Sequence, residues 1–247
     1  MTKVCLIGNS HVAALKLGWP RIQARFPTMD LVFFASAGLS ITFEVQDGKL
    51  VCPDPRIRKR LALTSGGEGD IEPVYDVYVL CGLELSSMRA FRAYAAKRRA
   101  EKAAVGRTVE DLVAAMEPAL RDTIAIEVAA KLRALTEAPM FMIATPLPAH
   151  ERHVEFWDRL KALEMEATVA QSYHLACKNV AGEHEAIFLP QPAQTVGENG
   201  LTTRNRFYLL KPDQVAAEKS LHTHMNPDYG AIVLRDALEK IEALTKL

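Results

Sequence analysis

The chain is expected to form an α/β fold in which helices cover both faces of a mainly parallel sheet. Three features predict this: short apolar runs, helical stretches between them, and turn-forming residues after each run. The apolar runs are continuous rather than alternating, which is typical of strands buried on both faces. They occupy residues 4–7, 31–34, 77–80, 141–144 and 186–189. Their alternation with helices predicts βαβ units and a three-layer α/β/α sandwich.

The helical stretches are expected at residues 11–25, 108–135, 155–180 and 227–244. Trp19-Pro20 is expected to break the first stretch. The second should open on Thr108, because Thr108 and Asp111 have the spacing of a capping arrangement. Pro118 is expected to divide that stretch, since proline removes a backbone donor and clashes one turn back.

One domain spanning residues 1–247 is expected, because no repeat and no linker interrupts the pattern. Residues 41–73 depart from the alternation and predict an inserted hairpin, with Asp47-Gly48 as its turn. Residues 65–70 read as a loop. Residues 190–212 form a second loop, and a loop of that length is typically functional or disordered.

Composition excludes several classes of function. The 247 residues carry 30 basic and 30 acidic side chains, which argues against nucleic-acid binding through bulk charge. No apolar run reaches about 18 residues, so no membrane span is expected. The first strand begins at Lys3 and leaves no room for a signal peptide, which favours a cytoplasmic location.

Metal binding and disulfide bonding are not expected. Among the four cysteines there is no CxxC pair, so the usual zinc spacing is absent. Cys5 and Cys81 lie in apolar runs and are expected to be buried, reduced thiols. The histidines at 150, 153, 174 and 184 lack a metal-like spacing and are expected at the surface.

Ser10 is the first candidate for chemistry. It lies where the first strand turns into the first helix, at the sheet edge where parallel α/β folds bind ligands. Unpaired N–H groups at a helix start can stabilise an oxyanion, although a serine there can also simply cap the helix. A nucleophilic serine needs a base. His224, just before the capping pair Asn226-Pro227, is the best candidate.

Four short motifs resemble the conserved blocks of the SGNH/GDSL hydrolase superfamily. They are "IGNSH", "SAGLS", "CGLE" and "HMNPDYG", and together they span nearly the whole chain. The resemblance implies a flavodoxin-like sandwich with Ser10 as nucleophile and His224 as base. Backbone N–H groups of Ser10 and Gly38 would form the oxyanion hole, without a metal or organic cofactor. The other residues expected around the pocket are Asn9, His11, Gly82, Glu84 and His222.

The chain departs from that superfamily at two positions. Glu84 replaces the asparagine of the third block, and an ionised carboxylate there would repel an oxyanion unless protonated or turned away. Leu221 occupies the position of the aspartate that orients the histidine. A backbone carbonyl, Glu84 or another acid could orient His224 instead, and a Ser-His dyad remains feasible.

The sequence therefore predicts a serine-dependent ester hydrolase that forms an acyl-enzyme with a small-molecule or saccharide ester. Two alternatives remain: an O-acyltransferase that acts on a sugar or other alcohol, and a catalytically decayed small-molecule binding protein. Residues 54–60 and 89–102 are rich in basic side chains. Such runs are usually solvated surface, but the second follows the third block and is a candidate for binding an anionic substrate. No feature indicates an oligomeric state.

Overall fold

The computed structural model describes residues 1–36, 41–100, 108–209 and 224–245. Its centre is a five-stranded sheet in the order β2-β1-β5-β6-β7, with every neighbouring pair parallel. The strands are β1 (Thr2–Gly8), β2 (Met29–Ala35), β5 (Val77–Cys81), β6 (Met140–Ile143) and β7 (Ala186–Leu189). All five predicted strands are confirmed, and the strand order is the flavodoxin-like one.

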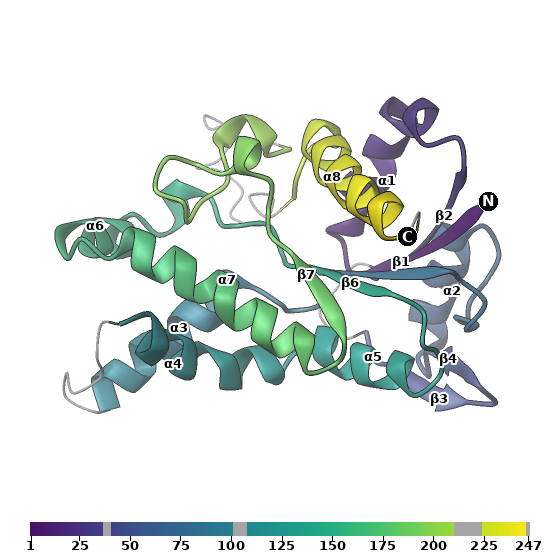
Figure 1. Cartoon of the computed structure of the whole chain (residues 1–247), viewed down its shortest axis with the longest axis horizontal. Helices are drawn as coiled ribbons and strands as arrows, with labels where there is room; N and C mark the ends of the chain where they lie inside the picture. Colours follow the sequence, from purple (N-terminus) through teal and green to yellow (C-terminus); the bar gives the residue numbers. More distant parts are fainter. Residues whose placement is uncertain (37–40, 101–107, 210–223, 246–247) are drawn as a thin grey trace.

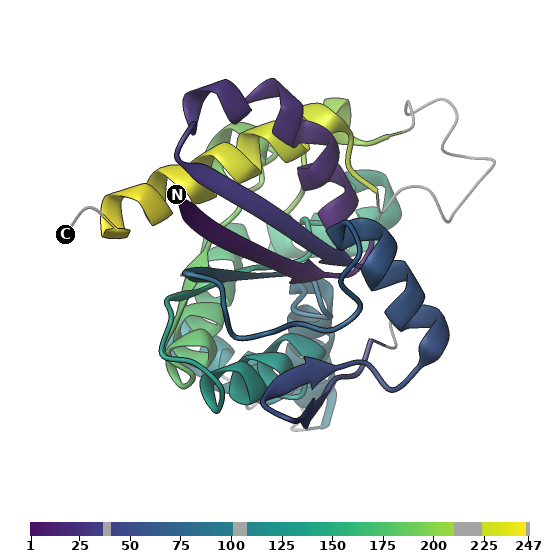
Figure 2. The ribbon, with the colours of Figure 1, turned by 90° about the vertical axis from the view of Figure 1, so that its right-hand side faces the viewer.

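Helices cover both faces of the sheet, which confirms the three-layer fold (Figures 1 and 2). One face is covered by α1 (Val12–Gly18) and α8 (Pro227–Thr245). The opposite face is covered by α3 (Ser87–Ala100), α4 (Val109–Arg121), α5 (Ile124–Arg133), α6 (Val154–Ala162) and α7 (Glu166–Gly182). No helix within the described residues is long and apolar enough to cross a membrane.

The continuous apolar pattern of β1 follows from these two covers. Val4 and Leu6 pack into the core beneath α1 and α8, whereas Cys5 and Ile7 pack into the core on the α3–α7 side. All four side chains are fully buried. Successive side chains of a strand point to opposite faces, so a strand with two covered faces needs apolar residues at every position.

The insertion contains the expected hairpin and one helix that was not expected. β3 (Glu44–Gln46) and β4 (Lys49–Val51) pair antiparallel. Asp47 and Gly48 connect them with φ of 49° and 75°, as a two-residue hairpin turn requires. The basic residues 54–60 begin α2 (Pro55–Ser65), which is capped by the Asp54 side chain. The loop at 65–70 begins where this helix ends, with Gly66 in the left-handed region.

Two predicted helix boundaries were wrong. Pro118 lies inside α4, and the helix ends instead after Arg121, where the carbonyls of Ala119 and Asp122 accept hydrogen bonds from Arg89. The stretch at 155–180 is two helices, α6 and α7, separated near Glu164, which has a φ of 54°. The predicted break after α1 is confirmed, because short 3-10 turns follow at Trp19–Arg21 and Gln23–Arg25.

Glycines allow α1 and α8 to cross closely. A Cβ atom on Gly230 would overlap the carbonyl oxygen of Ala14, and one on Gly18 would overlap the backbone of Ala231. The first turn of α8 therefore lies directly on α1. This contact brings the segment before α8 to the same edge of the sheet as the segment before α1.

Candidate functional site

The candidate site lies where the chain leaves β1 and β5 in opposite directions. β1 leads into α1 on one face of the sheet, whereas β5 leads into α3 on the other. The two strands are neighbours, with Gly8 opposite Cys81. Ligands of open α/β sheets bind in the crevice that such a divergence creates.

The turn after β1 holds Ser10 beside this crevice. A Cβ atom on Gly8 would overlap the carbonyl oxygen of Cys81, so glycine lets the two strand ends approach closely. The buried Asn9 accepts a hydrogen bond from the N–H of His11 at 3.2 Å, and its carbonyl accepts one from Val12 at 3.1 Å. These bonds fix the backbone on both sides of Ser10.

Ser10 does not cap α1, because His11 occupies the N-cap position and makes no side-chain capping bond. The backbone N–H of Ser10 has no hydrogen-bond acceptor among the residues that the structure describes. An N–H in this position is available to stabilise negative charge on a bound group. The geometry thus favours the chemical role of Ser10 over the capping role.

His224 reaches the same edge from the other end of the chain. Its carbonyl accepts a hydrogen bond from the N–H of Leu209 at 3.0 Å. Asn226 then caps α8, with its Oδ1 accepting from the N–H of Tyr229 at 3.0 Å, which confirms its predicted capping role. The Asn226 N–H also donates to the carbonyl of Phe207 at 2.9 Å. His224 is therefore held between the loop at 205–209 and α8.

Ser10 and His224 line one cleft of about 600 Å³. The other residues around it are Asn9, His11, Glu84, Ser86, Met88, Arg89, Arg92 and Thr145. Within the described residues, no hydrogen bond joins the Ser10 hydroxyl to the His224 imidazole. Catalytic hydrogen bonds are often long before substrate binds, so two side chains that line one cleft can still act together once a substrate is present.

His11 adds a second imidazole to the cleft. Its ring centroid lies 6.2 Å from that of His224, with the rings tilted by 40°. Its Nδ1 is buried without a hydrogen-bond partner in the described part of the chain. Burial, and secondly the charge of His224, lower the pKa of His11 to about 4. His11 is therefore neutral near pH 7.

Glu84 is turned towards a cation. It follows Gly82 and Leu83 in a tight turn where all three residues have positive φ values, of 76°, 48° and 66° for Gly82, Leu83 and Glu84. The Glu84 carboxylate pairs with the Arg89 guanidinium at 2.8 Å. This ion pair compensates the negative charge that replaces the amide of the superfamily pattern.

Arg89 itself is anchored to the end of α4. Its guanidinium also pairs with the Asp122 carboxylate at 2.8 Å and donates to the carbonyl of Ala119 at 2.9 Å. Arg92, one turn further along α3, also lines the cleft. The basic stretch at 89–102 therefore begins at the site, as expected if it binds an anionic substrate rather than only contacting solvent.

Several predicted site residues lie outside the described part of the chain. These are Gly38 and His222, and Leu221, which stands where the superfamily has its orienting aspartate, also lies outside that part. Conversely, Ser86, Met88 and Thr145 line the cleft without having been predicted individually. Their positions after β5 and β6 were the available signal, because the carboxyl ends of parallel strands share one edge.

Metal and thiol chemistry have little support in the described residues. Within them, no group of three or more His, Cys, Asp or Glu side chains could hold a metal ion. All four cysteines are free and buried, which confirms the expectation for Cys5 and Cys81. Burial raises the pKa of Cys81 to about 12, so this thiol is un-ionised near neutral pH.

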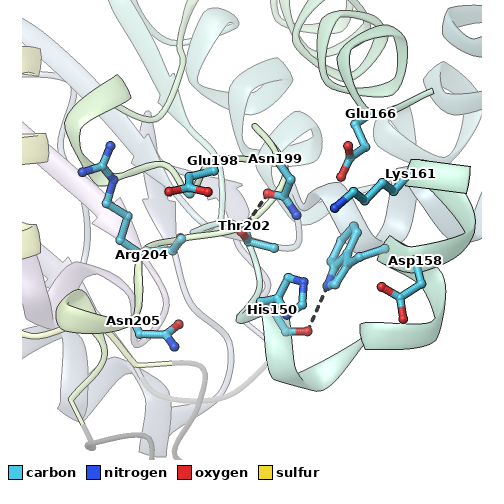
Figure 3. A pocket seen from close by; sticks show the side chains of 12 residues that line it. His150, Asp158, Lys161, Glu166, Glu198, Asn199, Thr202, Arg204 and Asn205 are labelled. Carbon is cyan, nitrogen blue, oxygen red and sulfur yellow. Dashed lines mark hydrogen bonds between the residues drawn. The ribbon is translucent and has the colours of Figure 1, made fainter. Parts of the chain in front are cut away.

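A larger hollow of about 800 Å³ lies beside α6 (Figure 3). The charged side chains that line it include both signs, among them Lys161, Arg204, Glu166 and Glu198. The indole N–H of Trp157 donates to the His150 carbonyl at 3.0 Å. Neither Ser10 nor His224 lines this hollow.

Comparisons with known proteins show a weak likeness to solved structures and no sequence relative. No protein-family model matches the chain, and no curated protein matches it. Among solved structures, the periplasmic domain of a lipopolysaccharide acetyltransferase from Salmonella ser. Paratyphi A is similar in fold, with a TM-score of 0.44. It is 12% identical, over 97% of this chain and 83% of that chain.

Proposed function

We propose that the protein is a serine-dependent acyl-handling enzyme that cleaves a small-molecule or saccharide ester through an acyl-enzyme. The observation that carries this proposal is the shared cleft of Ser10 and His224 at the carboxyl edge of a parallel sheet. The motifs that resemble the SGNH/GDSL blocks support it, because the same two residues hold the nucleophile and base positions of that pattern.

In the first half of the reaction, the Ser10 oxygen attacks the acyl carbonyl while His224 takes its proton. The carbonyl oxygen becomes an oxyanion, which the free N–H of Ser10 stabilises. The tetrahedral intermediate then collapses, the bond to the leaving alcohol breaks, and His224 returns the proton to that alcohol. The Arg89 guanidinium compensates the charge of the Glu84 carboxylate, so this carboxylate repels the developing oxyanion less than a free one would.

In the second half, a water molecule or an acceptor alcohol attacks the acyl-Ser10 ester. His224 takes the proton of the attacking group and returns it to the Ser10 oxygen as the acyl group leaves. Water gives hydrolysis and an alcohol gives O-acyl transfer, so the two reactions use the same residues. We take hydrolysis as the primary proposal and transfer to a sugar or other alcohol as its alternative.

Labelling with a fluorophosphonate probe and mass spectrometry of the labelled peptide test the nucleophile. The parent protein should be labelled at Ser10 and should hydrolyse short p-nitrophenyl esters. Ser10→Ala should lose both properties, and His224→Gln should lose most of both, while circular dichroism stays unchanged. Ser86→Ala is the matched control for loss of a hydroxyl in this cleft, because within the described residues the Ser86 hydroxyl accepts a hydrogen bond from the backbone N–H of Arg89 and is bonded to neither His11 nor His224.

The same experiment separates the alternatives. Acid release that falls when a saccharide acceptor is added, with a matching acylated product, assigns transfer rather than hydrolysis. Absence of labelling and of ester cleavage in the parent protein would contradict both reactions and would favour a binding role for the cleft.

A further inference from the structure

A second cavity continues from the Ser10 cleft. It has a volume of about 200 Å³ and shares His11, Met88, Arg92 and Thr145, among other residues, with the walls of the cleft. Because the two spaces have walls in common, a ligand with its reacting carbonyl at Ser10 can extend into the second cavity. The groups that line this cavity can therefore contact the substrate and select which ester is bound.

Two arginines without an acidic partner line this cavity. Arg92 comes from α3, and Arg152 comes from the 3-10 turn His150–Arg152. Neither forms an ion pair with any carboxylate in the described residues, whereas Arg89 pairs with two. Glu151, which directly precedes Arg152 in the sequence, accepts a hydrogen bond from the Asn205 side chain instead.

His153 reports the local excess of positive charge. It was expected at the surface, but it is half-buried and lines the same cavity. Burial lowers its pKa, and the charges of Arg152 and Arg92 lower it further. Both guanidinium groups are thus close enough to His153 for their charges to act on it.

The rest of the cavity is largely apolar. Met88, Pro146, Leu147 and Met225 contribute to its walls. Arg92 and Arg152 are themselves exposed to solvent at this cavity. Guanidinium groups bind carboxylate and phosphate oxygens through paired, charge-assisted hydrogen bonds.

We propose that Arg92 and Arg152 bind an oxyanion group of the substrate, so that the cleft selects esters that carry a carboxylate or a phosphate. This inference rests on the proposed function, since it assigns a substrate class to the Ser10 cleft. It also gives Arg92, in the basic stretch at 89–102, a role in substrate binding, whereas a basic run at the surface usually only contacts solvent.

Matched ester pairs test the selection. The p-nitrophenyl esters of butyrate and succinate differ in one terminal carboxylate on the acyl part. Acetylglycerol and acetylglycerol phosphate differ in one phosphate on the alcohol part. In at least one pair, kcat/KM of the parent protein should favour the anionic member by about tenfold or more, the scale of a charged hydrogen bond. The pair that shows the preference identifies which part of the ester carries the anion.

The double variant R92Q/R152Q should reduce this ratio to about one, because each ratio compares two esters on the same protein and cancels any change that affects both. Arg56→Gln is the control, because Arg56 is an exposed arginine of α2 away from the cavity, and it should keep the parent ratio. A ratio that is the same in the parent and the double variant for both pairs overturns the proposal.

Calorimetric titration with inorganic phosphate and with succinate, at low ionic strength, separates this proposal from the reaction itself. Saturable binding of either anion in the parent and in Arg56→Gln, but not in R92Q/R152Q, supports the anion site. If the parent cleaves no ester, the proposed function fails, and this titration alone decides the anion site. Binding that is absent, or that survives the double replacement, then overturns it.

Discussion

The Glu84 carboxylate and the Arg89 guanidinium are paired at 2.8 Å in the cleft that Ser10 and His224 line. Arg89 is fixed from behind by the Asp122 carboxylate and the Ala119 carbonyl. The pair is therefore held by the end of α4 and does not depend on substrate. In the proposed reaction, this pairing would compensate the charge of the Glu84 carboxylate beside the developing oxyanion.

Arg89→Met should leave Glu84 unpaired and lower kcat/KM for ester cleavage by about ten- to a hundredfold, because a free carboxylate repels the developing oxyanion. The same change should lower the free energy of unfolding by about 1–3 kcal/mol, since two carbonyls and two carboxylates lose a donor. Steady-state kinetics and urea denaturation measure the two effects separately.

The double variant E84Q/R89M is the control for the charge. It removes the carboxylate together with its partner, so it should recover a substantial part of the activity lost in Arg89→Met while staying equally destabilised. Equal activity of the single and double variants would show that Arg89 acts only through the packing of α3 against α4.

Gly230→Ala should destabilise the protein, although alanine normally stabilises a helix relative to glycine. The new Cβ would overlap the Ala14 carbonyl oxygen and force α8 away from α1. Overpacking of this kind costs about 1–3 kcal/mol, and ester cleavage should fall because His224 precedes α8.

Gly182→Ala, at the end of α7, is the matched control for Gly230→Ala. A Cβ there would meet nothing within 4 Å, so this variant should be neutral or slightly stabilised. Thermal unfolding of the two variants beside the parent measures the difference. Equal melting temperatures would contradict the close crossing of α1 and α8.

The sequence was sufficient to predict the central sheet, and to predict that a segment near the start of the chain and one near its end lie at the same edge of that sheet. The apolar run at 4–7 has side chains buried on both faces, and such a pattern has few alternatives to a parallel strand. The sequence also placed Ser10 and His224 at strand and helix ends that topology brings to one edge. These predictions depend on local pattern and on general rules of strand connection.

The partners within the site could not be predicted in the same way. The pairing of Glu84 with Arg89 needs the turn of positive φ residues at 82–84 and the end of α4, which are far apart in the sequence. Arg89 also donates to the carbonyls of Ala119 and Asp122 at the end of α4, which lies after Arg121 rather than at Pro118. No local motif in the sequence encodes these tertiary hydrogen bonds.

Gly82→Ala should be more destabilising than Gly48→Ala, although both glycines have nearly the same φ, of 76° and 75°. A side chain in the left-handed region costs about 1–2 kcal/mol at either position. At Gly82 the new Cβ would also lie 2.6 Å from the Oδ1 of Asn9, whereas at Gly48 it meets nothing within 4 Å. Urea denaturation should therefore give an excess cost for Gly82→Ala, and equal costs would show that Asn9 moves aside freely.

The stability of the protein should fall between about pH 6.5 and pH 4 because of His11. Its pKa is lowered from 6.5 to about 4 in the folded chain, mainly by burial, so the unfolded chain binds the proton more tightly across this window. The free energy of unfolding is thus highest above pH 6.5 and decreases as the pH falls towards 4, by up to about 3 kcal/mol. His11→Gln removes the titrating imidazole and should therefore lessen this decrease. Urea denaturation of parent and variant at pH 7, 5.5 and 4.5 measures the difference. Parallel pH profiles for the two proteins would show that the His11 imidazole is protonated as readily in the folded chain as in the unfolded one.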